Sequence, residues 1–368
     1  MKVLHILNEL KYSGAEVMLK VALEEFNKSN IESHIVSKGK YIGNYAKILK
    51  EEGYKTSHIS FKPAYKVVFN MFRMVRYINR NEIDVIHIHT GSNYLWVLIA
   101  SKLSNAKKII RTVHNAFYLN GIRYFKHYIE RKIARIFDVK HYSISESVHT
   151  SEKNEFNNET VIIDNWYNDK KFEPVDYNEK SRLRKSLKLP VNKTILITVG
   201  NGSKVKNYWS IIDSLQKLDK NIIYIYIGNQ DPNVPESDYA RRSGVGDRFF
   251  YLGSVNNVDE YLKASDIYLM PSLYEGFGIA AIEAIGVGLP CILSEAPGLK
   301  DFIEAGKGVY YINLDNIVAG ICEKIEFIND LSVGEKEEIK NNLSNFAKTN
   351  FGIENGVRRY IQVYNSIQ

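Results

Sequence analysis

The chain has 368 residues, of which 45% are hydrophobic and 25% charged, a balance typical of soluble globular proteins and sufficient for two domains. Its two cysteines, Cys291 and Cys322, have no paired spacing, which argues against a disulfide framework or a zinc site and favours a reducing cytoplasm. The longest apolar runs, such as 94–100, are too short to span a bilayer, and the first ten residues lack a signal-peptide cleavage site.

The net charge of +7 is unevenly distributed. Residues 1–180 contain 28 lysines and arginines against 20 acidic residues, a balance of +8, whereas the remainder contains 21 against 22, a balance of −1. The basic half therefore predicts an anionic partner: a membrane surface, a phosphorylated acceptor or nucleic acid. No nucleic-acid-binding motif is recognised in the chain, so nucleic acid is not expected as a partner.

Short β-rich apolar runs alternate with longer amphipathic segments. In the first half, strands are expected at 2–7, 84–89, 108–113 and 141–145, and helices at 14–26 and 68–78. In the second half, strands are expected at 194–200, 222–228, 248–253, 266–271 and 290–295. This alternation predicts an α/β fold with two doubly wound, Rossmann-like parallel-sheet domains that face each other across a cleft.

A polar, highly charged segment with two prolines, at 164–193, separates the two halves. We expect an N-terminal domain at 1–170, a linker at 171–193 and a C-terminal domain at 194–345. The remaining segment, 346–368, ends in a predicted helix at 355–368.

Two features of the first half lie at predicted strand ends, where open parallel sheets bind ligands. Gly14 lies between the first strand and a helix, where it is part of either a ligand-binding loop or a plain turn. His114 lies at the end of the strand at 108–113. His87 and His89 share one face of a strand and resemble a metal pair. Because no carboxylate or cysteine follows at ligand spacing, we favour a structural or cleft-lining role for His89 and no metal.

Two basic, aromatic segments, 61–80 and 117–137, also belong to the first half. On a helix, Lys66, Arg73 and Arg80 recur every seven residues and form a stripe, and the second segment contributes Arg123 and Lys126. Such a surface rests on anionic lipid or an acceptor, or it is an ordinary solvated helix face. The charge excess of the whole half favours the anionic partner.

The stretch SLYEGFGIAAIEA, 272–284, contains the most informative pattern in the chain. Glycines let the backbone approach a ligand closely, and the amides at the start of the following helix form an anion site; these residues are Gly276, Phe277, Gly278 and Ile279. Glu275 and Glu283 flank this anion site, and their carboxylates accept hydrogen bonds from donors such as vicinal hydroxyls. A nucleotide sugar satisfies both demands. The alternative is that the acidic residues only complement the helix dipole.

With its flanks, PSLYEGFGIAAIEAIGVGLPCILSE (271–295), this stretch resembles the signature of the retaining glycosyltransferase family four. Glu275, seven residues, Glu283 and then Gly288-Leu289-Pro290 are in register with that signature. The resemblance covers essentially the whole chain and implies the GT-B fold, with the C-terminal helix crossing back to the first domain. It also implies a nucleotide-diphosphate sugar donor, by default UDP-linked, held mainly by the second domain, and retention of anomeric configuration.

The resemblance also implies residue roles for the donor. Glu275 would hold sugar hydroxyls, Glu283 the ribose, and Lys206 the diphosphate. The family has arginine where this chain has Asn201, a departure that puts stabilisation of the leaving group in doubt. Lys204 is either a substitute for that arginine or a surface lysine.

Further roles follow from the same resemblance. His114 would approach the donor sugar, and backbone groups near Ser254 and Val255 would pair with the nucleobase. The family's glycine-rich first loop matches Ser13-Gly14-Ala15-Glu16, with one glycine missing. Sugar specificity would depend on Phe277, Ile279 and His114.

The chain contains no Asp-x-Asp, the pair that holds a divalent metal on the diphosphate in the other major glycosyltransferase fold. We therefore expect no metal and no cofactor, with amides and lysine neutralising the diphosphate. The predicted protein is a cytoplasmic hexosyltransferase at the inner membrane face, which acts on a lipid-diphosphate-linked glycan for bacterial capsule, lipopolysaccharide O-antigen or exopolysaccharide. Alternatives are a nucleotide-sugar epimerase on the same fold and a catalytically weak nucleotide-sugar-binding protein, which only Asn201 supports.

Overall fold

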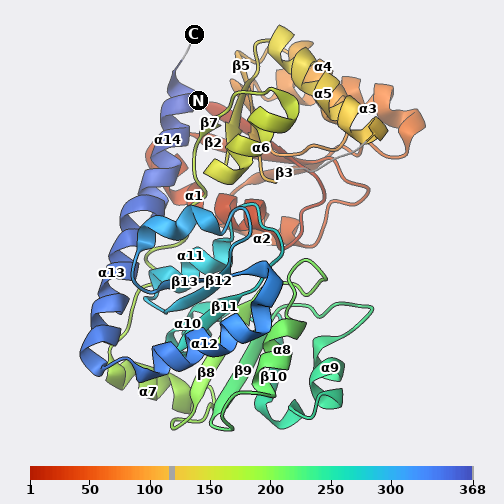
Figure 1. Ribbon diagram of the computed structural model, residues 1–368. Coiled ribbons are helices and arrows are strands. Elements are labelled where there is room, and N and C mark those ends of the chain that lie inside the picture. The colour runs from red at the N-terminus through yellow and green to blue at the C-terminus, as the bar shows by residue number, and fades with distance from the viewer. Residues whose placement is uncertain (116–120, 367–368) are drawn as a thin grey trace. The chain divides into compact units, whose positions relative to one another are not determined.

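The computed structural model describes residues 1–115 and 121–366 (Figure 1). The chain forms two compact units, one of Met1–Trp166 with Ile353–Gln368 and one of Tyr167–Gly352. Each unit contains one all-parallel sheet with helices, so the predicted α/β class with two doubly wound domains is confirmed. The first residues of the predicted segment 117–137, and residues 367–368, lie outside the described part.

The first unit has a seven-stranded sheet in the order β3-β2-β1-β4-β5-β6-β7. Its strands are β1 (Lys2–Leu7), β2 (Glu32–Ser37), β3 (Lys55–His58), β4 (Val85–Ile88), β5 (Lys108–Val113), β6 (Lys140–Ser143) and β7 (Val161–Ile162). Its helices are α1 (Gly14–Lys28), α2 (Tyr45–Glu52), α3 (Val67–Arg80), α4 (Tyr94–Lys102), α5 (Gly121–Ile136), α6 (Glu146–Phe156) and α14 (Ile353–Asn365), with a 3₁₀ turn at Ala64–Lys66.

The helices of the first unit cover its sheet on two faces. Met71, Met74 and Ile78 of α3 pack with α4 on a core that includes alternate residues of β1 and β4. On the opposite face, α1 packs against α14. The buried stripe on α3 leaves its basic residues on the outer side, as the helical period requires.

The second unit has a six-stranded sheet in the order β10-β9-β8-β11-β12-β13. Its strands are β8 (Thr194–Val199), β9 (Ile222–Ile227), β10 (Phe249–Gly253), β11 (Ile267–Met270), β12 (Cys291–Ser294) and β13 (Val309–Ile312). Its helices are α7 (Tyr177–Ser186), α8 (Trp209–Leu215), α9 (Glu236–Arg242), α10 (Val258–Ala264), α11 (Ile279–Gly286), α12 (Ile317–Asp330) and α13 (Val333–Phe351). Short 3₁₀ turns lie at Gly246–Arg248, Lys300–Ala305 and Leu314–Asn316.

The segment expected as a linker, 171–193, belongs to the second unit and contains α7. Lys180 and Arg184 of α7 bind the two oxygens of Asp266 at 2.7 and 2.6 Å. Asp266 also accepts a hydrogen bond from the amide of Ile195, at the start of β8. The polar composition that suggests a linker therefore serves ion pairs that attach α7 to the sheet.

Strand order reverses once in each sheet, between β1 and β4 in the first and between β8 and β11 in the second. The carboxyl ends of the strands at such a reversal are where open parallel sheets bind ligands. The described helices include none long and apolar enough to cross a membrane.

Candidate functional site

The two loops that the sequence singles out follow β8 and β11, the neighbouring strands between which the strand order of the second sheet reverses. The loop after β8 carries Asn201, Lys204 and Lys206, and the loop after β11 carries Glu275. The amide of Leu273 donates to the carbonyl of Val205 at 2.7 Å and ties the loops together. This contact brings residues about 70 positions apart in the chain into one site.

An ion pair between Lys206 and Glu275 lies at the centre of this site. The ammonium of Lys206 contacts Oε1 of Glu275, and the hydroxyl of Ser272 donates to the same oxygen at 3.0 Å. Both side chains are mostly buried. The structure thus brings together the two residues expected to hold the diphosphate and the sugar, and it adds Ser272, which the sequence analysis missed.

The backbone of Glu275 is held by a second loop. Its amide donates to the carbonyl of Pro297 at 3.2 Å, and the following Gly298 has a φ of +82°. A β-carbon on Gly298 would lie 2.5 Å from the carbonyl oxygen of Glu275. The close approach therefore requires glycine at this position, both for its conformation and for space.

The start of α11 has the expected geometry, but one side chain points elsewhere. Gly278 precedes the helix in the left-handed region, at φ +81°, and Ile279 is its first residue. Gly276 is buried in the loop ahead. Phe277 is only 2% exposed and packs against Phe302 and Phe351, with ring centroids 5.3 and 5.4 Å away. Phe277 therefore belongs to the core, and only its backbone is available to a ligand.

Glu283 lies on α11, about one turn after its start. Burial raises the pKa of its carboxyl to about 8, a shift that nearby Lys171 opposes and Asp259 reinforces. Lys171 itself contacts Asp259 at 3.1 Å. A carboxyl with this pKa is mostly protonated at neutral pH and ionises most readily when donors surround it.

Asn201, in the place of the family's arginine, bridges two loops. Its Oδ1 accepts hydrogen bonds from the backbone amide and the side-chain amide of Asn229, at 3.0 and 3.1 Å. Its acceptor oxygen is thus used within the protein, and its NH₂ group is the donor that the side chain has left. Gly202, in the same loop, lies so close to the buried carboxylate of Glu236 that a β-carbon would collide with it. Lys204 is exposed on this loop.

The loop expected to read the nucleobase follows β10. Gly253 turns there with φ +67°, and its carbonyl accepts from the amide of Gly228 at 2.9 Å. Ser254 is exposed and Val255 half-buried. Both follow β10 at the carboxyl edge of the sheet, and two strands, β9 and β8, separate β10 from β11, which Glu275 follows.

In the first unit, Gly14 begins α1 directly after β1 and is exposed. The hydroxyl of Ser13 donates to the carboxylate of Glu16, whose pKa burial raises. Ser13 and Glu16 thereby fix the first turn of α1, to which Gly14 belongs.

His114 follows β5 and contacts another histidine. Its Nε2 lies 3.0 Å from Nδ1 of His89, which follows β4. Burial lowers the pKa of His114 to about 4, so the ring is neutral at pH 7. His89, favoured as structural or cleft-lining, therefore lies directly behind the residue expected to meet the sugar.

His5, which the sequence analysis missed, lies with His87 and His89. One ring nitrogen from each of the three comes within 4.8 Å of the others, an arrangement that could hold a metal ion. His87 contacts Tyr364 and Thr112 with its two nitrogens, at 2.7 Å each. The only early signal for His5 is a polar residue inside the otherwise apolar run KVLHIL.

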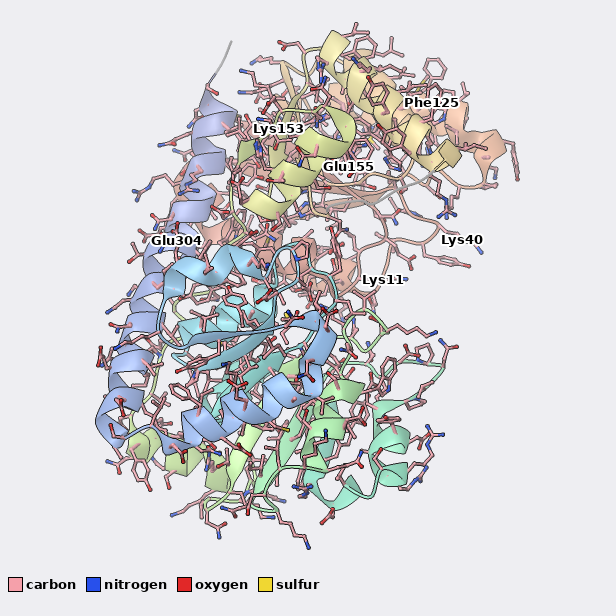
Figure 2. All side chains as sticks on the ribbon, in the orientation of Figure 1. Lys11, Lys40, Phe125, Lys153, Glu155 and Glu304 are labelled. Carbon is pink, nitrogen blue, oxygen red and sulfur yellow. The ribbon has the colours of Figure 1, made fainter. Side chains whose placement is uncertain are left out.

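The basic residues expected at a membrane or acceptor surface are all exposed: Lys66, Arg73, Arg80, Arg123 and Lys126. Large aromatic side chains accompany them, with Phe69 66% exposed, Phe72 58% and Phe125 62%. Figure 2 shows Phe125 directed outward from α5. Since α4 contacts both α3 and α5, these side chains belong to one layer of helices.

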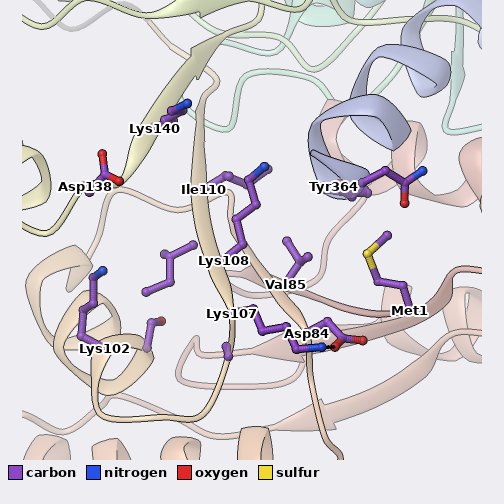
Figure 3. Close-up of a pocket in the computed structure, with 14 residues that line it drawn as sticks. Met1, Asp84, Val85, Lys102, Lys107, Lys108, Ile110, Asp138, Lys140 and Tyr364 are labelled. Atoms are coloured by element: carbon purple, nitrogen blue, oxygen red, sulfur yellow. Dashed lines mark hydrogen bonds and ion pairs between the residues drawn. The ribbon is translucent and has the colours of Figure 1, made fainter. Parts of the chain in front are cut away.

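A separate hollow of about 600 Å³ lies at the opposite, amino-terminal edge of the first sheet (Figure 3). Lysines and aspartates line it, and two of the lysines bind an aspartate or the end of the chain after α14. Lys107 contacts Asp84 at 2.8 Å, and Lys108 donates to the carbonyl of Ser366 at 2.7 Å. The hollow has no feature of the predicted site.

Two models of known protein families match the chain. The model of glycosyl transferases group 1 matches residues 179–342, and that of glycosyltransferase family 4 matches residues 12–149. An Escherichia coli UDP-Gal:α-D-GlcNAc-diphosphoundecaprenol α-1,3-galactosyltransferase is 23% identical over 71% of this chain and 70% of its own. The Staphylococcus aureus capsular polysaccharide biosynthesis glycosyltransferase CapH is 26% identical over 77% of this chain and 78% of its own.

Solved structures show the same fold. Anabaena HepE in complex with UDP-glucose superposes with a TM-score of 0.84 at 18% identity, over the full length of both chains. A Rickettsia africae glycosyltransferase gives the same TM-score and identity, over 100% of this chain and 98% of its own. The two family models together span most of the chain, and each unit has the parallel sheet expected. The chain belongs to the family four glycosyltransferases and has their GT-B fold.

Proposed function

We propose that this glycosyltransferase moves a hexose from a UDP-sugar, with retention of configuration, to a lipid-linked glycan in bacterial surface polysaccharide biosynthesis. The observation that carries the proposal is the Lys206–Glu275 pair, placed where strand order reverses and beside the start of α11. The named relatives support the substrate class: one acts from UDP-galactose on a diphosphoundecaprenol-linked sugar, another builds capsule, and HepE binds UDP-glucose.

In this proposal the donor separates the ion pair. Lys206 turns to the diphosphate, Glu275 accepts hydrogen bonds from sugar hydroxyls, and the amides at the start of α11 receive phosphate oxygens. Glu283 ionises as the ribose hydroxyls donate to it. Asn201 contributes its NH₂ group in place of the family's charged arginine, and the backbone of Ser254 and Val255 pairs with the base.

The reaction breaks the bond between the anomeric carbon and the diphosphate oxygen. The acceptor oxygen forms its bond on the same face, and its proton passes to the departing diphosphate. Lys206 and the amides stabilise the charge that develops there, so the proposal needs no metal. Glu275 is not assigned as a nucleophile, because Ser272 and the sugar hydroxyls occupy its carboxylate. His114 contacts the sugar.

The acceptor is assigned to the basic first unit at the inner face of the cytoplasmic membrane. Exposed phenylalanines on α3 and α5 would enter the headgroup region, while Lys66, Arg73 and Arg123 face anionic lipid. Nucleic acid is not proposed as a partner.

A donor screen by mass spectrometry tests the function. The protein is incubated with a panel of nucleotide sugars and a short lipid-diphosphate glycan, beside Glu275→Ala, Lys206→Ala and the control Glu337→Ala. Glu337 forms an ion pair with Lys340 on α13, away from the proposed donor residues. We expect one acceptor mass increase of a hexose, lost in the first two variants and kept in the control.

Other outcomes of the screen contradict the proposal. A changed sugar on the nucleotide without acceptor modification would establish an epimerase. Nucleotide-sugar binding with neither reaction would establish a binding protein, and inversion of the new linkage by NMR would exclude the retaining mechanism.

A further inference from the structure

Four of the nine histidines lie on one face of three adjacent strands or just beyond their ends. His5 on β1 is the register partner of His87 on β4, His89 follows β4, and His114 follows β5. Helix α1 covers the inner end of this row, where Phe26 stacks on His5 with centroids 5.8 Å apart. The row runs from the covered core toward the carboxyl end of the sheet.

Three of these rings form a continuous hydrogen-bonded chain. Nδ1 of His5 lies 3.1 Å from Nε2 of His89, and Nδ1 of His89 lies 3.0 Å from Nε2 of His114. Burial lowers the pKa of His5 to about 3 and of His114 to about 4, and it holds that of His89 well below its usual range. All three are therefore neutral at pH 7, and each has one N–H donor and one lone pair. The donors in such a chain must all point the same way.

The inner end of the chain decides this direction. His5 is fully buried, and its Nε2 has no hydrogen-bond partner. The neighbouring hydroxyls are engaged elsewhere, that of Tyr54 with the carbonyl of Leu19 and that of Tyr364 with His87. A buried N–H without an acceptor is rarer in proteins than an underused acceptor. The proton of His5 therefore belongs on Nδ1, the nitrogen that faces His89.

We propose that His5 and His89 are positioning residues that hold His114 in the tautomer with its proton on Nδ1. His5 donates to His89, His89 donates to Nε2 of His114, and His114 presents its Nδ1–H as a donor. Among the described residues, no protein group is bonded to Nδ1 of His114. That donor suits an oxygen of the substrate, such as a hydroxyl or phosphate oxygen; this last step rests on the function proposed above.

Tautomers are measured directly by long-range ¹H–¹⁵N correlation on the full-length protein labelled with [¹⁵N]histidine, at pH 7. His114→Gln identifies the signals of His114. We expect Nδ1 protonated and Nε2 unprotonated in the wild type. Signals showing the proton on Nε2, or a doubly protonated ring, would overturn the proposal without any variant having to fold.

Three variants test the origin of the tautomer. His5→Phe keeps a ring but removes the donor, and we expect the two nitrogen shifts of His114 to move toward each other as the tautomers mix. His5→Asn places a donor near the original Nδ1 and should restore the wild-type shifts. His141→Phe is the control, because His141 is buried but bonds to Tyr94 and Asn158 instead. Unmoved His114 shifts in folded His5→Phe would refute the role of His5.

A metal ion is the competing explanation for the cluster of His5, His87 and His89. Elemental analysis of the purified protein and spectra recorded with and without EDTA distinguish the two. Stoichiometric metal, with His5 and His89 shifts that change on chelation, would replace the proposal with a metal site. Absence of metal and unchanged spectra are the expected results.

Activity supplies a separate measure. In the transfer assay, His5→Phe should lower kcat/KM about 2- to 10-fold, the size of one hydrogen bond, and His5→Asn should recover most of it. If the wild type transfers no sugar, the proposed function fails while the tautomer measurement stays interpretable. If it transfers sugar with the proton on Nε2, only the positioning proposal fails.

Discussion

The two sheets reverse strand order in the same way, yet the side chains at the two reversal points differ in electrostatic character. In the second unit an ion pair, Lys206–Glu275, lies beside backbone amides and the partly buried Glu283. In the first unit the corresponding place holds neutral rings, from His5 to His114. In the proposed function the two opposite charges bind the diphosphate and the sugar, whereas the neutral rings donate one proton to an oxygen of the substrate. One topology thus supports two kinds of recognition.

The largest effect is expected from removing the cation of the charged site. Lys206→Ala should lower kcat about 10²- to 10³-fold, because the leaving diphosphate loses a preorganised charge. Steady-state kinetics with saturating donor measure this. Lys217→Ala removes an exposed lysine on the same unit and should stay near wild type. Equal kinetics for both variants would show that Lys206 has no role in the reaction.

The loop that supports Glu275 provides the next test. Gly298→Ala should lower the free energy of unfolding by about 1–3 kcal/mol and reduce transfer, because its β-carbon would collide with the Glu275 carbonyl at a positive φ. Urea denaturation and the transfer assay measure the two effects. Gly334→Ala is the matched control, since a β-carbon there meets nothing within 4 Å. A Gly298→Ala protein as stable and active as the control would contradict the account of this loop.

Binding to lipid vesicles tests whether the basic surface of α3, in the first unit, differs from the surface of the second unit. Reversing Arg73 and Arg76 on α3 to glutamate should weaken binding to anionic vesicles by at least about fivefold per arginine, with the effect fading as salt screens the charges. Co-sedimentation at low and high salt measures it. Lys217→Glu combined with Lys348→Glu, at two exposed positions of the second unit, changes the net charge by the same amount and is the control. Equal losses in both would indicate a general charge effect and no docking surface on α3.

The smallest expected effect is a pH dependence of UDP affinity. Free Glu283, with a pKa of about 8, is mostly protonated at pH 6, and ribose hydroxyls favour the ionised form. Affinity measured by calorimetry should therefore rise from pH 6 to 8 and level off above. Glu283→Gln should abolish this slope. An affinity that falls over the same range would exclude the proposed contact.

The Glu283 carboxyl has the opposite effect on the pH dependence of folding stability. Its pKa is raised in the folded protein, so the folded state binds the proton more tightly, and this contribution to stability declines as pH rises from about 4.5 to 8. Glu283→Gln should remove that decline in urea denaturation. Unchanged pH dependence in the variant would show that Glu283 is not desolvated.

Local patterns predicted much of the fold. The expected strands at 2–7 and 108–113 match β1 and β5, because apolar β-branched residues in short runs report burial between helices. Strands β2, β3, β7 and β13 were not predicted. Polar residues interrupt β2, β3 lies at the edge of the sheet, and β7 has only two residues. The apolar periodicity of these three strands is therefore weak.

By itself the sequence determined the α/β class, the family and the positions of Glu275, Glu283 and Lys206, since these depend on short-range spacing. Only the tertiary structure decided which way side chains point and which distant residues meet. Phe277 faces the core because Phe302 and Phe351 surround it, and Asn201 is held by Asn229. His5 meets His89, 84 positions away, because β1 pairs with β4 in a register that no local pattern encodes.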